Sequence, residues 1–370
     1  MEDKIKFNQK NLILKVNENY DMSKLNLLRW DRFLDVLCEN RNYQKEAIKS
    51  AIIYLASGMY NSLEDLVKEN YDNNPELRKK YLKLEDYNSK LQIKNKLFGN
   101  IDLATGTGKS YAIYGIAQIL LSENIVKRVL VLCPSLIIEK GLTKKFEELS
   151  SNSDLRNAMP EGLEGTTPRI ISADSTICEG DICVENIHAV YETTGSSIKD
   201  SFKNGGEDTL VLNDESHHIF NKTDEKGNSG KNIKKWKDFL LNKDYNFKYI
   251  LAFTGTAYID NEYFNDVIYR YSLRSAIDDG IVKTIDYVQK DDLPGDREYK
   301  FQKIRENHET NKRKFPKIKT ISILITKDIR SAKNLYEDFI EFLCDFESIE
   351  KEIAERKILI VTSDASHKAN

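Results

Sequence analysis

The sequence predicts an α/β fold in which helices cover a parallel β-sheet. From Asn100 onward, short apolar segments alternate with amphipathic segments of helical spacing, the pattern that parallel α/β sheets produce. A glycine-rich string and an acidic string each follow one of the apolar segments. The chain has 370 residues, 40% of them apolar, which is enough for two domains with cores of their own.

Residues 1–99 are predicted to form a helical region. Between Leu25 and Gly58, apolar residues recur at spacings of three and four, as on the buried face of a helix. The stretch from Asn61 to Lys96 is highly charged, so we expect an exposed helical insertion there rather than core.

Residues 100–290 are predicted to form one domain with a parallel sheet. The expected strands are short and rich in apolar residues: Asn100–Leu103, Arg128–Cys133, Arg169–Ala173, Asp181–Val184, Thr209–Asn213 and Tyr249–Thr254. The expected helices between them carry apolar residues at helical spacing: Lys109–Ser122, Ile138–Leu149 and Ile233–Leu241.

Residues 291–319 are charged and nearly free of apolar residues, so we interpret them as a basic linker. After this linker we expect a strand at Thr320–Thr326, a helix at Ile329–Asp345 and a strand at Lys357–Thr362. One strand-helix-strand unit cannot bury both faces of a sheet. The second domain, residues 320–370, is therefore expected to be the incomplete start of another α/β unit.

The charge of the chain gives no overall attraction to nucleic acid, because the formal net charge is −3. Local basic segments are the alternative. Asn221–Lys248 has eight lysines against four acids, and Arg297–Lys319 has nine basic residues against three acids. Each segment is either a nucleic-acid contact, through residues such as Lys234 and Lys235, or a solvated face.

Targeting signals are not visible in the sequence. It contains no run of about 18 apolar residues, and the N-terminus lacks the apolar run of a signal peptide. The five cysteines are too few and too scattered for a disulfide framework. We therefore expect a cytoplasmic protein with reduced thiols and no membrane contact.

The segment after the first predicted strand has the features of a phosphate-binding P-loop. Its glycines allow backbone N–H groups to turn toward phosphate, and the following helix adds its dipole. Lys109 is the expected partner of the β- and γ-phosphates of a nucleotide, and Ser110 is the expected Mg²⁺ ligand. The nucleotide-binding residues of this string are Thr105, Gly106, Thr107, Gly108, Lys109 and Ser110.

An acidic pair follows the predicted strand that ends at Asn213. Asp214 is the candidate partner of Mg²⁺, and Glu215 is the candidate base that orients and deprotonates the attacking water. His217 and His218 come next, but their spacing from the cysteines matches no zinc site. We expect His217 to link the hydrolytic site to the sheet or to the second domain.

Three further strings resemble motifs of superfamily 2 helicases and stand in the same order. Tyr43 and Gln44 look like a Q motif, in which a glutamine amide reads the edge of adenine. Thr254 and Thr256 look like motif III, which couples hydrolysis to movement. The string after the second predicted strand looks like motif Ia, a loop that binds the nucleic-acid strand, with these candidate residues: Pro134, Ser135, Lys140 and Gly141.

Within superfamily 2, the chain most resembles the motor subunits of type III restriction enzymes. This closer resemblance depends on the motif Ia string, on Asn213 to His218 and on Tyr269 to Lys283, which looks like the segment leaving the first motor domain. It implies a RecA-like P-loop NTPase domain, followed by the truncated start of a second one. It also implies ATP with Mg²⁺ as fuel, double-stranded DNA as the track, and a modification methyltransferase-type subunit as partner.

The resemblance also implies features that the sequence does not show. Family members carry motifs V and VI in the second domain, with an arginine that completes the ATP site, and often a nuclease domain beyond. Because these are not visible, we expect the chain to bind Mg·ATP but to hydrolyse it poorly unless Arg270 or Arg274 replaces that arginine. Two alternatives stay open: an RNA helicase, and a nucleotide-binding regulatory module that is inactive unaided.

Overall fold

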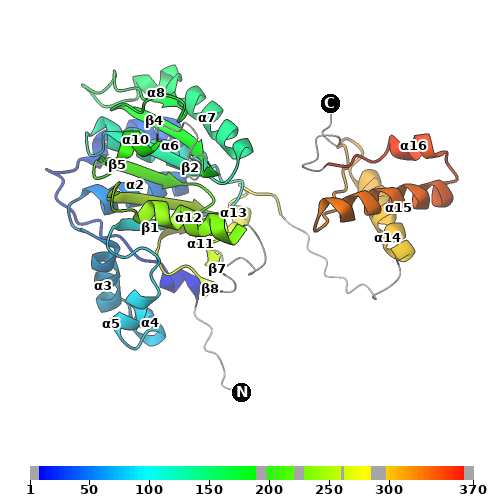
Figure 1. Ribbon diagram of the computed structural model, residues 1–370, viewed down its shortest axis with the longest axis horizontal. Helices are drawn as coiled ribbons and strands as arrows, with labels where there is room; N and C mark the ends of the chain where they lie inside the picture. Colours follow the sequence, from blue (N-terminus) through cyan, green and yellow to red (C-terminus); the bar gives the residue numbers. More distant parts are fainter. Residues whose placement is uncertain are drawn as a thin grey trace. The chain divides into compact units, whose positions relative to one another are not determined.

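The chain divides into two compact units, residues 1–284 and residues 285–370 (Figure 1). The computed structural model describes residues 8–188, 198–203, 205–220, 229–259, 262–284 and 297–361. Within these ranges, every helix is too short or too polar to cross a membrane.

The first unit is built on a sheet of seven parallel strands in the order β3-β4-β2-β5-β6-β1-β9. The strands are β1 (Leu97–Leu103), β2 (Arg128–Cys133), β3 (Arg169–Ile171), β4 (Asp181–Asn186), β5 (Thr209–Asn213), β6 (Tyr249–Thr254) and β9 (Val267–Tyr271). In a separate two-stranded sheet, β7 (Tyr258–Ile259) pairs antiparallel with β8 (Glu262–Tyr263). Parallel strands buried on both faces read as continuous apolar runs, as in β2 and β5.

Helices pack on the sheet, with α12 lying in front of it in the view of Figure 1. The helices before β1 are α1 (Asp31–Cys38), α2 (Asn42–Ala56), α3 (Leu63–Asn73), α4 (Pro75–Lys80) and α5 (Leu84–Ser89), preceded by two short 3-10 helices, Gln9–Leu12 and Leu27–Trp30. The later helices are α6 (Lys109–Ser122), α7 (Leu136–Ser150), α8 (Ser153–Asn157), α10 (Ile198–Phe202), α11 (His217–Phe220), α12 (Ser229–Leu241) and α13 (Leu273–Asp278).

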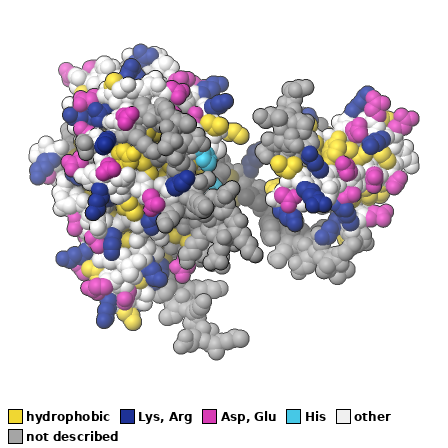
Figure 2. Space-filling view, viewed as in Figure 1, with side chains coloured by type: hydrophobic (Ala, Val, Ile, Leu, Met, Phe, Trp, Pro, Cys, Tyr) yellow, Lys and Arg dark blue, Asp and Glu magenta, His cyan; other side chains and the backbone are white. Residues whose placement is uncertain are grey.

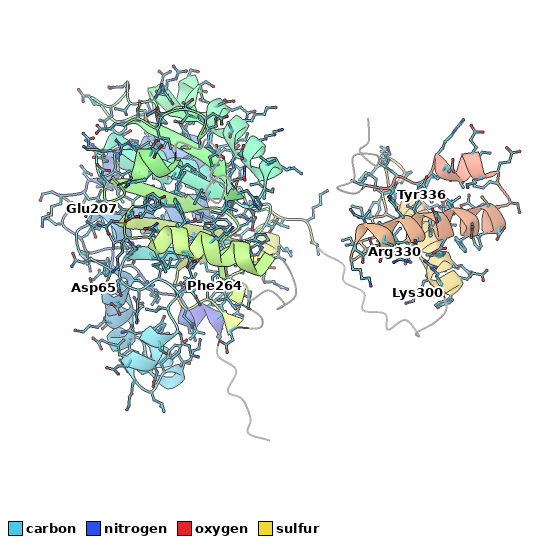
Figure 3. The ribbon with its side chains drawn as sticks, in the orientation of Figure 1. Asp65, Glu207, Phe264, Lys300, Arg330 and Tyr336 are labelled. Carbon is cyan, nitrogen blue, oxygen red and sulfur yellow. The ribbon has the colours of Figure 1, made fainter. Side chains whose placement is uncertain are left out.

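The charged insertion is helical, as predicted, but it is not merely an exposed appendage. Its first helix, α3, begins at a capping box in which the Asp65 carboxylate, labelled in Figure 3, accepts from the backbone of Ser62. Leu63 and Leu66 are fully buried in the core of the first unit. The Tyr87 hydroxyl donates to the carbonyl of Asn265, so the insertion also holds the turn before β9. The expectation that it lies outside the core is therefore wrong.

All six predicted strands are present, but the sheet has a seventh. β9 pairs in parallel with β1 at the sheet edge, in the string that we expected to leave the domain. Val267, Ile268 and Tyr271 are buried, whereas Tyr269 and Arg270 are half-buried, so this strand lacks the fully buried apolar run of the inner strands. The backbone N–H of Leu14 donates to the carbonyl of Val267, so the N-terminal segment contacts this edge strand.

The second unit differs from the prediction. It contains α14 (Arg297–Lys314), α15 (Ile329–Glu347) and α16 (Lys351–Glu355), and Lys300, Arg330 and Tyr336 are labelled on the first two in Figure 3. The predicted linker is therefore largely a helix, and its Phe301 is buried against Phe339 and Phe342.

The two strands predicted in the second unit are also wrong for the residues that the structure describes. Residues 319–326 and 357–361 have no ladder partner there, and Ile323 and Ile325 are 82% and 91% exposed. A strand needs a neighbour to satisfy its backbone hydrogen bonds, and an apolar sequence alone does not supply one.

Candidate functional site

The sequence motifs meet at one edge of the sheet. The P-loop follows β1, the motif Ia string follows β2, the acidic string follows β5, and Thr254 ends β6. Because neighbouring strands run parallel, their carboxyl ends lie at the same edge, where open α/β sheets place ligand sites. Tertiary folding thus brings together residues as distant in the sequence as Thr105 and Thr254.

The P-loop has the backbone shape that phosphate binding needs. Gly106 and Gly108 adopt positive φ angles of 85° and 77°, a region that favours glycine. The Thr107 side chain is turned inward, and its hydroxyl donates to the carbonyl of Ala104 at 2.6 Å. Lys109 and Ser110 begin α6, so their backbone N–H groups are at a helix N-terminus.

Tyr43 and Gln44 hold the P-loop from α2. The hydroxyl of Tyr43 and Nε2 of Gln44 both donate to the carbonyl of Thr107, at 2.9 and 2.7 Å. Gln44 is fully buried, and its Oε1 has no hydrogen-bond partner among the described residues. The contact with adenine stays a prediction, for which Gln44 offers an unpartnered acceptor atom. One face of the Tyr43 ring is stacked on Tyr271, with centroids 3.9 Å apart.

The acidic pair stands close to the P-loop lysine. Nζ of Lys109 lies 3.0 Å from Oε1 of Glu215. Glu215 has a left-handed φ of 52°, which is strained for a residue with a side chain. Its backbone N–H donates to the Asp214 carboxylate at 3.0 Å, which holds the two acids in a fixed relation.

His217 connects the acidic pair to the end of β6. Its Nδ1 lies 3.0 Å from Oγ1 of Thr254 and 3.5 Å from Oε2 of Glu215. Oγ1 of Thr254 in turn accepts from the backbone N–H of Thr256 at 3.0 Å. Lys109, Glu215, His217, Thr254 and Thr256 therefore form a continuous chain of contacts across three strand ends.

Burial shifts the pKa values of Asp214 and His217 in this site. Burial raises the pKa of Asp214 to about 6, and the nearby Lys109 charge opposes that rise. Burial also lowers the pKa of His217, as does the neighbouring His218. His217 is therefore neutral at pH 7 and can act as a hydrogen-bonding link rather than as a cation.

Gly255 is a site residue that the sequence reasoning missed. A Cβ atom at this position would lie 2.8 Å from Oγ1 and 2.9 Å from the backbone nitrogen of Thr105. The third motif thus touches the P-loop directly. The Thr-Gly-Thr string contains the signal, since only glycine permits such a close approach of two backbones.

The sequence of the chain also matches the model of a known protein family. The family model described as "Type III restriction enzyme, res subunit" matches residues 37–259, which is more than half of the chain. The chain belongs to this family. The matched range begins before Gln44 and ends after Thr256, so it contains the P-loop, the acidic pair and the third motif. It supports the assignment of a helicase-type ATPase.

Solved structures show similarity at low identity. The UvsW helicase from bacteriophage T4 is 16% identical, with a TM-score of 0.29, over 52% of this chain. Dbp5 from S. cerevisiae, bound to RNA and ADP BeF3, is 13% identical, with a TM-score of 0.33, over 70% of this chain. The chain spans 59% and 61% of the lengths of these two proteins. A search of curated proteins finds no match.

The predicted nucleic-acid residues are only partly described. Ser135 caps α7, with its hydroxyl accepting from the backbone of Ile138, and Lys140 and Gly141 are exposed in the first turns of this helix. Pro134 is half-buried beside them. The side chain of Lys234 lies outside the described residues, whereas Lys235 is exposed.

Basic residues form no single patch on the surface that is drawn. Figure 2 shows basic and acidic side chains interspersed on the displayed face of each unit. In α14, Arg305 pairs with Glu347, and Lys303 pairs with Glu306 at 2.7 Å. These pairs favour the interpretation of Arg297–Lys319 as a solvated face.

Proposed function

We propose that this chain is the ATP-binding half of a DNA-translocating motor of the type III restriction kind, working with a modification methyltransferase-type subunit. The observation that carries the proposal is the contact chain from Lys109 through Glu215 and His217 to Thr254. Such a chain joins the phosphate cradle, the hydrolytic acid and the third motif. A module that only binds nucleotide has no need of the acidic pair or of its link to β6.

The geometry fits Mg·ATP. Backbone N–H groups of the P-loop and the α6 N-terminus face the place of the phosphates. Ser110 and Asp214 would hold Mg²⁺, which when bound offsets the negative charge of the phosphates. Lys109 must exchange its contact with Glu215 for phosphate oxygens, which leaves Glu215 free to orient the attacking water and accept its proton.

The state of Gln44 supports adenine as the base. Both donor contacts of its amide go to the P-loop, so the buried Oε1 is left to accept. The exocyclic amino group of adenine is a donor, whereas guanine presents a carbonyl oxygen at the corresponding place. A buried acceptor facing another acceptor costs about 1–3 kcal/mol. ATP should therefore bind more tightly than GTP, by about fivefold or more.

The start of α7 supports a backbone-binding role toward DNA. The helix presents N–H groups at its N-terminus, with Lys140 exposed one turn later. A Cβ atom built on Gly141 would meet no other described residue within 4 Å, apart from its chain neighbours and the backbone of its own helix. Contacts of this kind bind DNA phosphates independently of the base sequence, as a motor that moves along DNA requires.

The chain alone should hydrolyse ATP slowly. Of the two arginines considered for the completing role, Arg270 is held in a buried ion pair, with its Nε 3.2 Å from Asp102, whereas Arg274 is 84% exposed and pairs with Asp278 on its own helix. In related phosphoryl-transfer enzymes such an arginine contributes about 10³–10⁵ in rate. Binding of Mg·ATP depends on the P-loop and should be much less affected.

The test is steady-state ATP hydrolysis by the full chain alone and with double-stranded DNA, single-stranded DNA or RNA. Glu215→Gln should lower turnover by about 10²–10⁴ while preserving ATP affinity, because the amide hydrogen-bonds but accepts no proton. Glu207→Gln, at the surface position labelled in Figure 3, is the matched control and should hydrolyse normally. Stimulation by RNA but not by DNA would refute the DNA track, and equal turnover in both variants would refute the role of Glu215.

A further inference from the structure

A second series of hydrogen-bonded polar side chains, which we call the polar relay, runs through the interior of the first unit, beneath the acidic pair. It comprises Ser216, which follows Glu215, Asn100 in the middle of β1, and Asp266, which precedes β9. Their exposed fractions are 0%, 0% and 1%. Asp266 comes two residues after Phe264, which Figure 3 labels in the first unit.

The side-chain hydrogen bonds of the polar relay run in one direction, from Ser216 through Asn100 to Asp266. The Ser216 hydroxyl donates to Oδ1 of Asn100 at 3.0 Å, and Nδ2 of Asn100 donates to Oδ1 of Asp266 at 2.6 Å. The backbone N–H of Asn100 also donates to the carbonyl of Asp266 at 2.8 Å. The polar relay thus joins the end of β5, β1 and the start of β9.

The Asp266 carboxylate fixes the orientation of the Asn100 amide, which lies between Ser216 and Asp266. An ionised carboxylate accepts but cannot donate, so the Asn100 amide must turn its NH₂ toward Asp266 and its oxygen toward Ser216. Burial raises the pKa of Asp266 to about 6, so it is mostly ionised at pH 7 although this position disfavours the charge. An apolar residue would avoid this cost, which indicates that the carboxylate has a function here.

The residue that needs support is Glu215. Its left-handed φ of 52° is held only if the residues on both sides are fixed. On one side, the N–H of Asp214 donates to the carbonyl of Leu132 at 2.8 Å. On the other side, the N–H of Ser216 donates to the carbonyl of Phe253 at 2.9 Å, and its hydroxyl is held by Asn100.

We propose that Asn100 and Asp266 are positioning residues for ATP hydrolysis: they hold Ser216 and thereby keep the strained backbone of Glu215 in its working conformation. This inference rests on the proposed function. Among the residues that the structure describes, the side chains of Asn100 and Asp266 make no hydrogen bond to the P-loop, so they should affect the rate of hydrolysis rather than the binding of ATP.

The test compares kcat and KM for ATP in the full chain with Ser216→Ala, Asp266→Asn and the double variant. Each single variant should lower kcat about tenfold, the factor that corresponds to about 1.4 kcal/mol, and leave KM within about twofold. The double variant should be no slower than the slower single variant, because Ser216→Ala removes one end of the polar relay and Asp266→Asn removes, at the other end, the acceptor-only carboxylate that fixes the Asn100 amide.

Asp181→Asn is the matched control for burial. Asp181 is a 1% exposed aspartate in β4 of the same sheet, where it accepts from Arg169 at 2.8 Å. Its loss should lower thermal stability but leave kcat within about twofold, because β4 is far along the sheet order from β1.

Three results would overturn the inference, and they are separable from a failure of the proposed function. If Asp266→Asn hydrolyses ATP as Asp181→Asn does, or if the effects of the two single changes multiply in the double variant, the relay does not position Glu215. If KM rises and kcat stays constant, the pair acts on binding. In each of these cases the wild-type chain and Glu215→Gln still differ, whereas equal turnover of those two proteins would refute the proposed function as well.

Discussion

Replacing Asp214 by asparagine should stabilise the folded protein at neutral pH while removing its activity. Burial raises the pKa of Asp214 from 3.8 to about 6, so the folded state disfavours the charged form. The free-energy difference at pH 7.5 is on the order of 3 kcal/mol, from roughly two pKa units at 1.36 kcal/mol each. Asparagine keeps the acceptor for the N–H of Glu215 and carries no charge.

The difference in the free energy of unfolding between Asp214→Asn and the wild type should change with pH in a defined direction. Because the folded pKa is raised, the stabilising effect of protonation is complete below pH 3.8 and is lost as the pH rises through about 6. The advantage of Asp214→Asn over the wild type should therefore be largest at pH 7.5 and shrink to about 1 kcal/mol at pH 4.5. It should vanish at lower pH.

Urea unfolding of the two proteins at pH 7.5 and pH 4.5 measures this difference. Trp236 is a suitable fluorescent reporter, since its indole N–H donates to Asn213, the residue before Asp214. Asp72→Asn, which removes an exposed carboxylate from α3, should change the free energy of unfolding by less than about 0.5 kcal/mol at both pH values. The same difference between Asp214→Asn and wild type at both pH values, or a less stable variant at pH 7.5, would refute the reasoning.

Three further predictions concern the P-loop and the track. Lys109→Ala should abolish tight ATP binding in calorimetry without unfolding the chain, and unchanged affinity would remove the P-loop assignment. Gly255→Ala should weaken ATP binding about tenfold or more because the new methyl group displaces the P-loop backbone, whereas Gly165→Ala, with nothing within 4 Å, should bind normally. Neutralising Lys235 and Lys237 together should weaken DNA binding and flatten its salt dependence, and an unchanged slope would leave α12 as a solvated face.

Much of the first unit was predictable because its signals are local. The strands β2, β5 and β6 and the helix α6 begin and end where the sequence predicts, since buried parallel strands are continuous apolar runs and α6 follows a glycine. The chemistry of the P-loop and of the acidic pair is likewise determined by short strings. These strings need only a strand before them and a helix or turn behind them.

Other features depended on partners far away in the sequence. The role of Asn100 is invisible in the strand pattern, because it exists only when β1 lies between Asp266 and Ser216. The contact of Gly255 with Thr105 likewise arises only because β6 and β1 are neighbours in the sheet. A side chain's partners are set by sheet order, and sheet order is decided by the packing of the whole unit.

By itself, the sequence determined the nucleotide-binding fold, the phosphate cradle and the acids that face it. Only the tertiary structure decided that β9 completes the sheet, that α14 is a packed helix, and that residues 319–326 form no strand. The physical reason is the same in all three cases. Local patterns set which conformations a segment favours, but hydrogen-bond partners and buried faces come from other segments, and these decide which conformation it adopts.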